Sequence, residues 1–412
     1  MKNKITVLIA CLFTIYSANS QSLDLKNDSI PKKEENKEIL GIPKKWFENL
    51  SLRGYMQVRY NGLLETNNDL GCEQCDKSWG GENNGFFLRR GRIVLSGNVT
   101  DRISIYIQPD FASSASSTNN ILQLRDAYFD VTLDTKKEFR IRVGQSKVPY
   151  GFENLQSSQN RLALDRNDGL NSAVSNERDL GMTFYWAPAG KRALFTKLVK
   201  DGLKGTGDYG VFGLGVYNGQ TANRPEANKN KHIVARVSYP FELKRNQVLE
   251  LGIQAYTGNY VVNSISSNVI TKPNAEYLDQ RAAASIVLYP KPFGFQAEYN
   301  IGTGPEFNTS NNTIEQKNLS GGYAQVFYKI DLKKQTVLPF VKYQMYRGGK
   351  KHELDARSYS VNDLEIGFEW QFFNNLEIVA DYTIANRRYE DAVNLNNHQK
   401  GNLLRLQLQL SF

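Results

Sequence analysis

The feature that most constrains this chain is an alternation of apolar and polar side chains with a period of two, which begins at Leu50 and returns along most of the sequence. In the first such segment, Met56 and Val58 alternate with Gln57 and Arg59. The same pattern returns at residues 103–108, 139–144, 293–299 and 363–370. Successive side chains of a strand point to opposite faces, so this period predicts strands with one apolar and one polar face.

The last residues show the same pattern in its purest form. Leucines and a terminal phenylalanine alternate there with polar residues, the apolar set being Leu404, Leu406, Leu408, Leu410 and Phe412 and the polar set Arg405, Gln407, Gln409 and Ser411. A closing strand that ends on an aromatic residue resembles the signal by which outer-membrane barrels are handed to their assembly machinery. The sequence therefore favours a barrel over a soluble sandwich.

Composition agrees with strands in a membrane rather than helices. The chain has 22 Tyr and 21 Phe, yet its mean hydropathy is −0.49. Beyond the N-terminus, no stretch approaches the roughly 18 apolar residues of a transmembrane helix. An apolar outer face, a polar inner face and hydrophilic loops account for both observations.

The N-terminus reads as a secretory signal, because Lys2 and Lys4 precede an apolar stretch over residues 5–16. A lipoprotein cleavage box ending at Cys11 is an alternative, which we disfavour because the apolar run continues past that cysteine. The polar residues that follow have no apolar period and predict a periplasmic lead-in. We therefore divide the chain into a signal peptide (1–20), a lead-in (21–49) and a barrel (50–412).

Tight and long connections alternate along the barrel. The tight ones are expected at 99–101, 133–137, 289–292, 331–334 and 373–375. The long ones are expected at 61–85, 112–121, 147–179, 219–230, 258–278, 302–319, 347–360 and 387–400. This predicts an all-β, transmembrane antiparallel β-barrel of about sixteen strands, with short periplasmic turns and long extracellular loops. Residues 188–208 must then be a periplasmic turn, although 192–200 could also form a strand.

Several motifs resemble the phosphate-selective porin O and P family. They lie in order at 87–92 (FLRRGR), 108–112 (QPDFA), 125–128 (RDAY), 142–151 (RVGQSKVPYG), 177–181 (ERDLG) and 215–219 (GVYNG). The likeness is clearest in the first half of the barrel. It implies a sixteen-stranded barrel, usually trimeric, with basic residues along the pore and a third loop folded into the lumen. Residues 147–179 occupy the place of that constriction loop and carry Arg161, Arg166 and Arg178.

The polar register gives candidates for the pore lining. The basic, anion-binding candidates are Arg53, Arg59, Arg90, Arg92, Arg140 and Arg142 on strands, with Lys147, Arg161 and Arg166 at the loop. The acidic candidates are Glu298, Asp363, Glu365, Glu369, Glu377 and Asp381. Guanidinium groups bind phosphate and carboxylate in a fork. Opposed basic and acidic walls would create a transverse field and a mixed or weakly anionic selectivity, unless these charges merely pair across strands.

The only cysteines left after export are Cys72 and Cys75. In an oxidising compartment this spacing favours a local disulfide, and a zinc site is disfavoured because four ligands are lacking. No metal site or cofactor is predicted.

Together these features predict a porin of the bacterial outer membrane, for passive diffusion of small hydrophilic solutes, in particular anions such as phosphate. Its expected partners are outer-membrane lipid, inorganic or small organic anions and two further copies in a homotrimer, and not nucleic acid. A structural or adhesive surface barrel is the alternative. An enzyme is disfavoured, because His232, His352 and His398 show no spacing to a nucleophile.

Overall fold

The computed structural model describes residues 46–72, 85–115 and 118–412. The predicted signal peptide, nearly all of the lead-in, and Cys75 lie outside these residues. Within the described ranges, no helix has the length and apolar character needed to cross a membrane.

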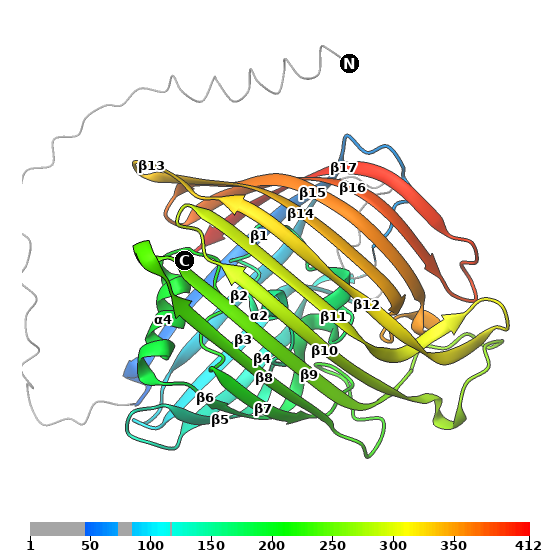
Figure 1. The fold of residues 1–412 in the computed structure, drawn as a ribbon, viewed down its shortest axis with the longest axis horizontal. Coiled ribbons are helices and arrows are strands. Elements are labelled where there is room, and N and C mark those ends of the chain that lie inside the picture. The colour runs from blue at the N-terminus through cyan, green and yellow to red at the C-terminus, as the bar shows by residue number, and fades with distance from the viewer. Residues whose placement is uncertain (1–45, 73–84, 116–117) are drawn as a thin grey trace, which may run out of the picture. The chain divides into compact units, whose positions relative to one another are not determined.

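One closed antiparallel sheet makes up the barrel (Figure 1). Its strands are β1 (Leu50–Leu63), β2 (Phe86–Asn98), β3 (Ile103–Ala115), β4 (Thr118–Thr132), β5 (Phe139–Lys147), β6 (Arg178–Trp186), β7 (Phe212–Tyr217), β8 (His232–Glu242), β9 (Val248–Val261), β10 (Glu276–Leu288), β11 (Phe293–Asn308), β12 (Thr313–Tyr328), β13 (Ile330–Leu332), β14 (Gln335–Gly349), β15 (Ser358–Phe373), β16 (Leu376–Glu390) and β17 (His398–Ser411). Neighbours in sequence pair with each other, and β1 also pairs with β17. Because β12 and the short β13 both pair with β14, the barrel has sixteen strands, as predicted.

The two faces of the sheet follow the period of two. On β15, Ile366 and Phe368 are 45% and 41% exposed, whereas Glu365 and Glu369 on the opposite face are 2% and 0% exposed. The apolar residues form the outer surface, and the polar residues fill the lumen. The alternation therefore identifies the strands and also the side to which each residue points.

Most connections at the rim that holds the C-terminus are short, such as 99–102, 243–247 and 374–375. Local side-chain bonds hold these turns: Asp134, between β4 and β5, accepts the backbone N–H groups of Lys136 and Phe139. By the usual asymmetry of outer-membrane barrels, this is the periplasmic rim.

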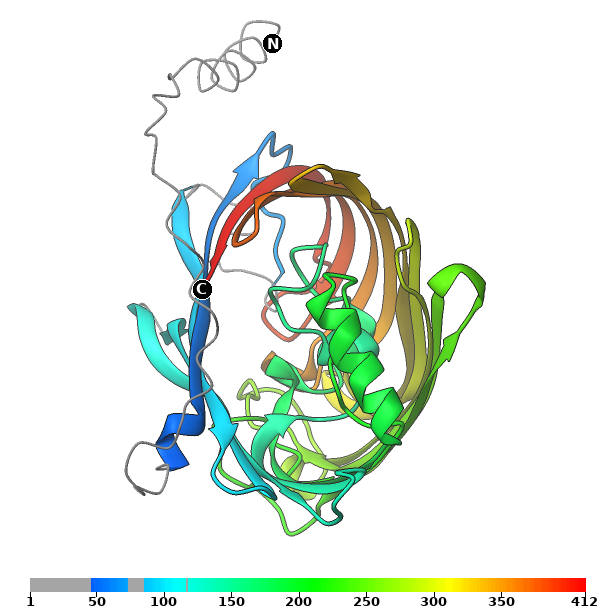
Figure 2. The same ribbon diagram turned by 90° about the vertical axis from the view of Figure 1, so that its left-hand side faces the viewer.

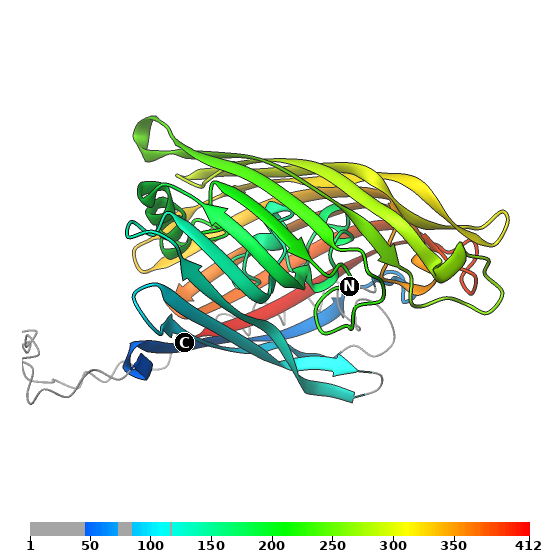
Figure 3. The same ribbon diagram turned by 90° about the horizontal axis from the view of Figure 1, so that it is seen from below.

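One periplasmic connection is long. Residues 187–211, between β6 and β7, form this connection, so the predicted turn at 188–208 is confirmed. Residues 192–200 are not a strand but lie in helix α4 (Ala189–Lys200). Figure 2 shows α4 inside the ring of strands, and Figure 3 shows it at the same end of the barrel as the C-terminus.

Two of the expected long loops are mostly strand. At 112–121, β3 runs to Ala115 and β4 resumes at Thr118, and at 302–319 only residues 309–312 separate β11 from β12. Outside the lipid, a strand needs no apolar outer face, and its backbone hydrogen bonds continue unchanged. The polar composition of these segments therefore shows where the sheet extends beyond the membrane. Asn312, with a φ of 56°, supplies the tight turn between β11 and β12.

Candidate functional site

Residues 148–177, between β5 and β6, fold into the lumen, and we call them the inward loop. They contain two short helices, α2 (Phe152–Leu155) and α3 (Asp168–Asn171). Tyr150, Asn167 and Leu170 of this loop are fully buried. The loop is therefore packed inside the barrel rather than exposed at its mouth.

The inward loop rests directly on the barrel wall at two places. Glu298 on β11 accepts the backbone N–H groups of Phe152 at 2.5 Å and Glu153 at 2.8 Å. At α3, a Cβ atom added to Gly169 would lie 2.7 Å from the carbonyl carbon of Gly321 on β12. The close approach of two backbones explains why glycine is needed at this contact.

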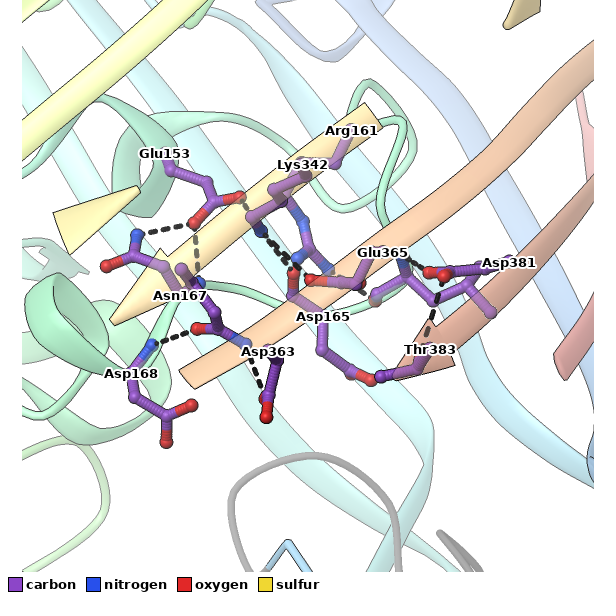
Figure 4. A network of polar contacts seen from close by, with 12 residues as sticks. Glu153, Arg161, Asp165, Asn167, Asp168, Lys342, Asp363, Glu365, Asp381 and Thr383 are labelled. Carbon is purple, nitrogen blue, oxygen red and sulfur yellow. Dashed lines mark hydrogen bonds and ion pairs between the residues drawn. The ribbon is translucent and has the colours of Figure 1, made fainter. Parts of the chain in front are cut away.

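Ion pairs fasten the loop to three strands on one side of the barrel, β14, β17 and β1, and Figure 4 shows part of this network. Lys342 on β14 donates to Glu153 at 2.6 Å and to the carbonyl of Asp165 at 3.0 Å. The Asp165 carboxylate pairs with Arg59 on β1 at 3.5 Å and with Arg405 on β17. All five residues are at least nine-tenths buried. Buried ion pairs of this kind fix geometry, and losing one partner is costly.

The third anchoring carboxylate is Asp168 at the start of α3. It pairs with Arg387 on β16 at 3.1 Å and with Lys350 beyond β14. Its backbone N–H donates to the Gln344 side chain at 2.9 Å.

Neighbouring cations keep these loop carboxylates ionised. Burial alone would raise the pKa of Asp165, but Arg405 and Arg59 outweigh burial and hold that pKa well below its ordinary value. The pKa of Asp168 is lowered in the same way, since Arg387 outweighs the opposing effect of burial.

The acidic candidates on the strands face the lumen, and five of the six, all but Glu377, have an ion-pair or hydrogen-bond partner among the described residues. Asp363 pairs with Arg387, and Arg405 reaches Glu365 at 3.5 Å and Asp381 at 3.2 Å. Two candidates lie nearer the periplasmic rim: Glu369 pairs with Lys204, while Glu377 is half-buried on the lumen side of β16. Most of these carboxylates are therefore paired with cations, which favours the alternative of pairing across strands over two opposed charged walls. Arg405 lies in the polar register of the last strand, so the alternation alone could have predicted that a cation faces these carboxylates.

The basic wall also carries its own counter-charges. Arg92 pairs with Asp110 at 2.7 Å, and Arg142 holds Asp130 through two hydrogen bonds of 2.8 and 3.0 Å. Arg140 reaches Asp208, in the connection that contains α4, at 2.8 Å. Asp110 and Asp130 were not among the candidates, although both stand in the polar register of their strands and the alternation could have placed them on this wall.

Four basic candidates differ from the others in having no ion pair among the residues that the structure describes: Arg53, Arg90, Lys147 and Arg161. Arg90 donates to the side-chain oxygen of Gln57 at 2.7 Å, and Arg161 donates to the carbonyl of Leu164 at 3.1 Å. Nε of Arg90 and both Nε and Nη1 of Arg161 are buried without a hydrogen-bond partner. The two guanidinium groups lie close enough to repel each other.

Lys147 and Arg166 serve the inward loop itself. Lys147 donates to the carbonyl oxygens of Leu155 at 2.9 Å and Gln156 at 2.6 Å, and Arg166 pairs with Glu177 at 2.9 Å.

The remaining candidates do not assemble a reactive site. Cys72 is disulfide-bonded, and its predicted partner Cys75 lies outside the described residues. His352 and His398 make separate hydrogen bonds, to Tyr260 at 3.1 Å and Asn386 at 2.7 Å. The described part of the chain holds no group of three or more His, Cys, Asp or Glu residues able to bind a metal ion.

A closed sixteen-stranded barrel with an apolar outside, a charged lumen and an inward loop defines the porin class of outer-membrane channels. The family model for phosphate-selective porin O and P matches residues 65–412, and the chain belongs to this family. It is a porin of the bacterial outer membrane that allows passive diffusion of small hydrophilic solutes.

Solved structures share this fold at low sequence identity. The outer-membrane channel DcaP of Acinetobacter baumannii has a TM-score of 0.56 and 14% identity, covering 88% of this chain and 97% of that one. OmpF of Salmonella typhi has a TM-score of 0.54 and 13% identity, covering 89% and 98%. OmpT of Vibrio cholerae, in a trimer form, has a TM-score of 0.51 and 10% identity, covering 88% and 100%. No curated protein matches the sequence significantly.

Proposed function

We propose that this porin prefers small anions, with inorganic phosphate among them, and that permeating anions bind transiently to Arg90 and Arg161. The observation that carries this proposal is the pair of buried guanidinium groups with unsatisfied donors and no carboxylate partner among the described residues. Buried polar groups normally have hydrogen-bond partners, so these donors mark a place where a ligand oxygen would be stabilised.

The chemistry follows from the charges around the two arginines. An anion between them would relieve their mutual repulsion and accept charge-assisted hydrogen bonds from both. A cation would gain nothing there, because the nearby carboxylate of Asp165 is already engaged by Arg59 and Arg405. Entry and exit require no energy source, since the site is reached by diffusion alone.

The inward loop is proposed to set the narrowest part of this path. Its three anchoring carboxylates, Glu153, Asp165 and Asp168, are neutralised by cations of the wall. The loop thereby enters the lumen without adding an unpaired negative charge. The electrostatic potential along the path is then set mainly by the positive charges of Arg90 and Arg161.

We also propose that residues 1–20 are removed on export and that the mature chain forms a homotrimer. OmpT of Vibrio cholerae, which shares the fold, is described in a trimer form. Chemical cross-linking of the protein extracted from membranes tests the assembly, and a predominant monomer would contradict it.

The test of anion preference is the reversal potential of the refolded protein in planar bilayers under a KCl gradient. We expect the wild type to favour Cl⁻ over K⁺ and phosphate to reduce the Cl⁻ current. The double variant R90A/R161A should lose most of this preference, whereas R102A, in the exposed turn between β2 and β3, should retain it. Equal permeability of both ions in the wild type would refute the proposal.

A further inference from the structure

The long periplasmic connection, residues 187–211, crosses the lumen, and we call it the periplasmic strap. Its helix α4 lies within the ring of strands (Figure 2). Leu198 and Leu203 of the strap are buried against Val248 of β9, Val287 of β10 and Tyr289 just beyond β10. The strap therefore packs against the lumen side of β9 and β10 through an apolar contact.

The far end of the strap reaches the opposite wall. Lys204 donates to both carboxylate oxygens of Glu369 on β15, at 2.6 and 2.7 Å. Gln156 of the inward loop donates to the carbonyl of Lys204 at 2.6 Å. The chain then returns toward β7 through Asp208, which pairs with Arg140 on β5 at 2.8 Å. The strap and the inward loop thus meet in the lumen, each entering from its own rim.

The strap and the inward loop leave a cavity against the wall formed by β1 and β3 to β6. Its volume is about 630 Å³, enough for a small organic molecule. Its aromatic side chains include Tyr106, Tyr128 and Tyr209, and its cations include Arg53, Arg142 and Lys200. The two carboxylates of the lining, Asp126 and Asp208, are paired with Arg178 and Arg140. We call this cavity the strap chamber.

The strap chamber combines positive charge with flat aromatic surface. Tyr106 and Tyr128 are cross-strand partners whose rings stack with centroids 5.1 Å apart and an 8° angle between planes. Arg142 lies over the Tyr128 ring at 3.8 Å, and Arg53 lies over the Tyr106 ring at 6.0 Å. Among the described residues, neither Arg53 nor Lys200 has an ion pair, and both are exposed to the chamber.

We propose that the strap chamber is a second binding site of the pore, which takes small organic anions that carry a flat ring. The anionic group pairs with Arg53 or Lys200, and the ring packs against the tyrosines. An inorganic anion gains only the first of these contacts. The inference rests on the anion preference proposed above and adds to it the class of solute.

The contacts predict the size of the discrimination. Aromatic contact adds a few-fold to about tenfold in affinity beyond area burial. A ring-bearing anion should therefore remain in the pore about 3- to 10-fold longer than a matched anion without a ring.

Single-channel recording of the full-length refolded protein tests this with benzoate and acetate, which share a carboxylate and differ in the ring. Added from the periplasmic side, benzoate should block the current with dwell times about 3- to 10-fold longer than those of acetate. The difference should disappear in Y106L and in Y209L, a strap variant that leaves the strands unchanged. It should persist in Y389L, which removes a half-buried tyrosine of β16 that stacks on Tyr359 outside the chamber.

The outcomes separate the two proposals. Equal dwell times in the wild type, or a benzoate effect that survives in both Y106L and Y209L, would overturn the strap chamber as a binding site. If the reversal potential still shows anion preference in that case, the proposed function stands. A reversal potential without anion preference would refute the proposed function, whatever the dwell times show.

Discussion

Replacing Asp165 by Asn removes one charge at the centre of the inward loop while keeping the shape of the side chain. In the wild type this carboxylate is nearly buried and serves Arg59 on β1 and Arg405 on β17. Arg405 retains Asp381 at 3.2 Å and Glu365 at 3.5 Å, but the loop loses the carboxylate that Arg405 and Arg59 share. We expect D165N to destabilise docking of the loop without unfolding the barrel, because the backbone hydrogen bonds of the strands remain intact.

The magnitude follows from the geometry. At 3.5 Å and an effective dielectric constant of about 20, one such pair has a Coulomb energy of roughly 5 kcal/mol, which desolvation partly offsets. Removing one partner of a buried pair typically costs about 3–5 kcal/mol. Because each 1.4 kcal/mol is about a tenfold change in an equilibrium constant, the undocked loop should become at least about a hundredfold more populated.

Limited trypsin digestion of the folded protein measures this population, since cleavage after Arg161 and Arg166 requires the loop to leave the lumen. D165N should be cut at these positions far faster than the wild type. The matched control is E242Q, which removes a carboxylate that is 65% exposed and paired with Lys191, and should leave the cleavage rate unchanged. If D165N and E242Q were cut equally slowly, the ion pairs would not be what holds the loop.

Two further predictions concern the same loop. G169A places a Cβ atom against the backbone of β12, so it should shift the inward loop and change the single-channel conductance. G190A on α4 is the control, because a Cβ atom there meets nothing within 4 Å and the conductance should not change. Equal conductance in both variants would refute the close contact at Gly169. Asp165 and Asp168 have lowered pKa values in the folded protein, so their contribution to docking is present above about pH 4 and is lost as pH falls through the folded values. The difference in conductance between the wild type and D165N should therefore persist from neutral pH to about pH 5 and shrink only below about pH 4. A difference that disappeared near pH 6 would contradict this assignment.

The fold was largely predictable because a strand in a barrel has only two faces. The alternation at Glu365, Ile366 and Phe368 gave both the strand and its orientation, and the parity of the connections gave sixteen strands. The end of each strand was harder to predict. Polar residues such as those at 302–319 extend the sheet above the lipid, and composition alone does not distinguish this extension from a loop.

The partners within the lumen were not predictable from the alternation. Arg405 and Asp165 are separated by 240 positions, and they meet only because the inward loop crosses to the closing strand. The helix α4 was missed for a related reason. Residues 192–200 lack a strong apolar face, and Leu198 acquires its contacts only when Val248 and Val287 line the lumen opposite it.

The contacts of the inward loop also bear on the fidelity of barrel assembly. β1 and β17 join the two ends of the chain, with Gln57 opposite Gln409 and Arg59 opposite Gln407. A slip of one residue in this pairing would turn Arg405 toward the lipid and leave Asp165 with only one of its two cations. Burial of the Asp165 carboxylate is compensated by both of its cations only after β1 and β17 have paired in the correct register. The inward loop thus stabilises the native pairing of β1 with β17 relative to a pairing that is shifted by one residue.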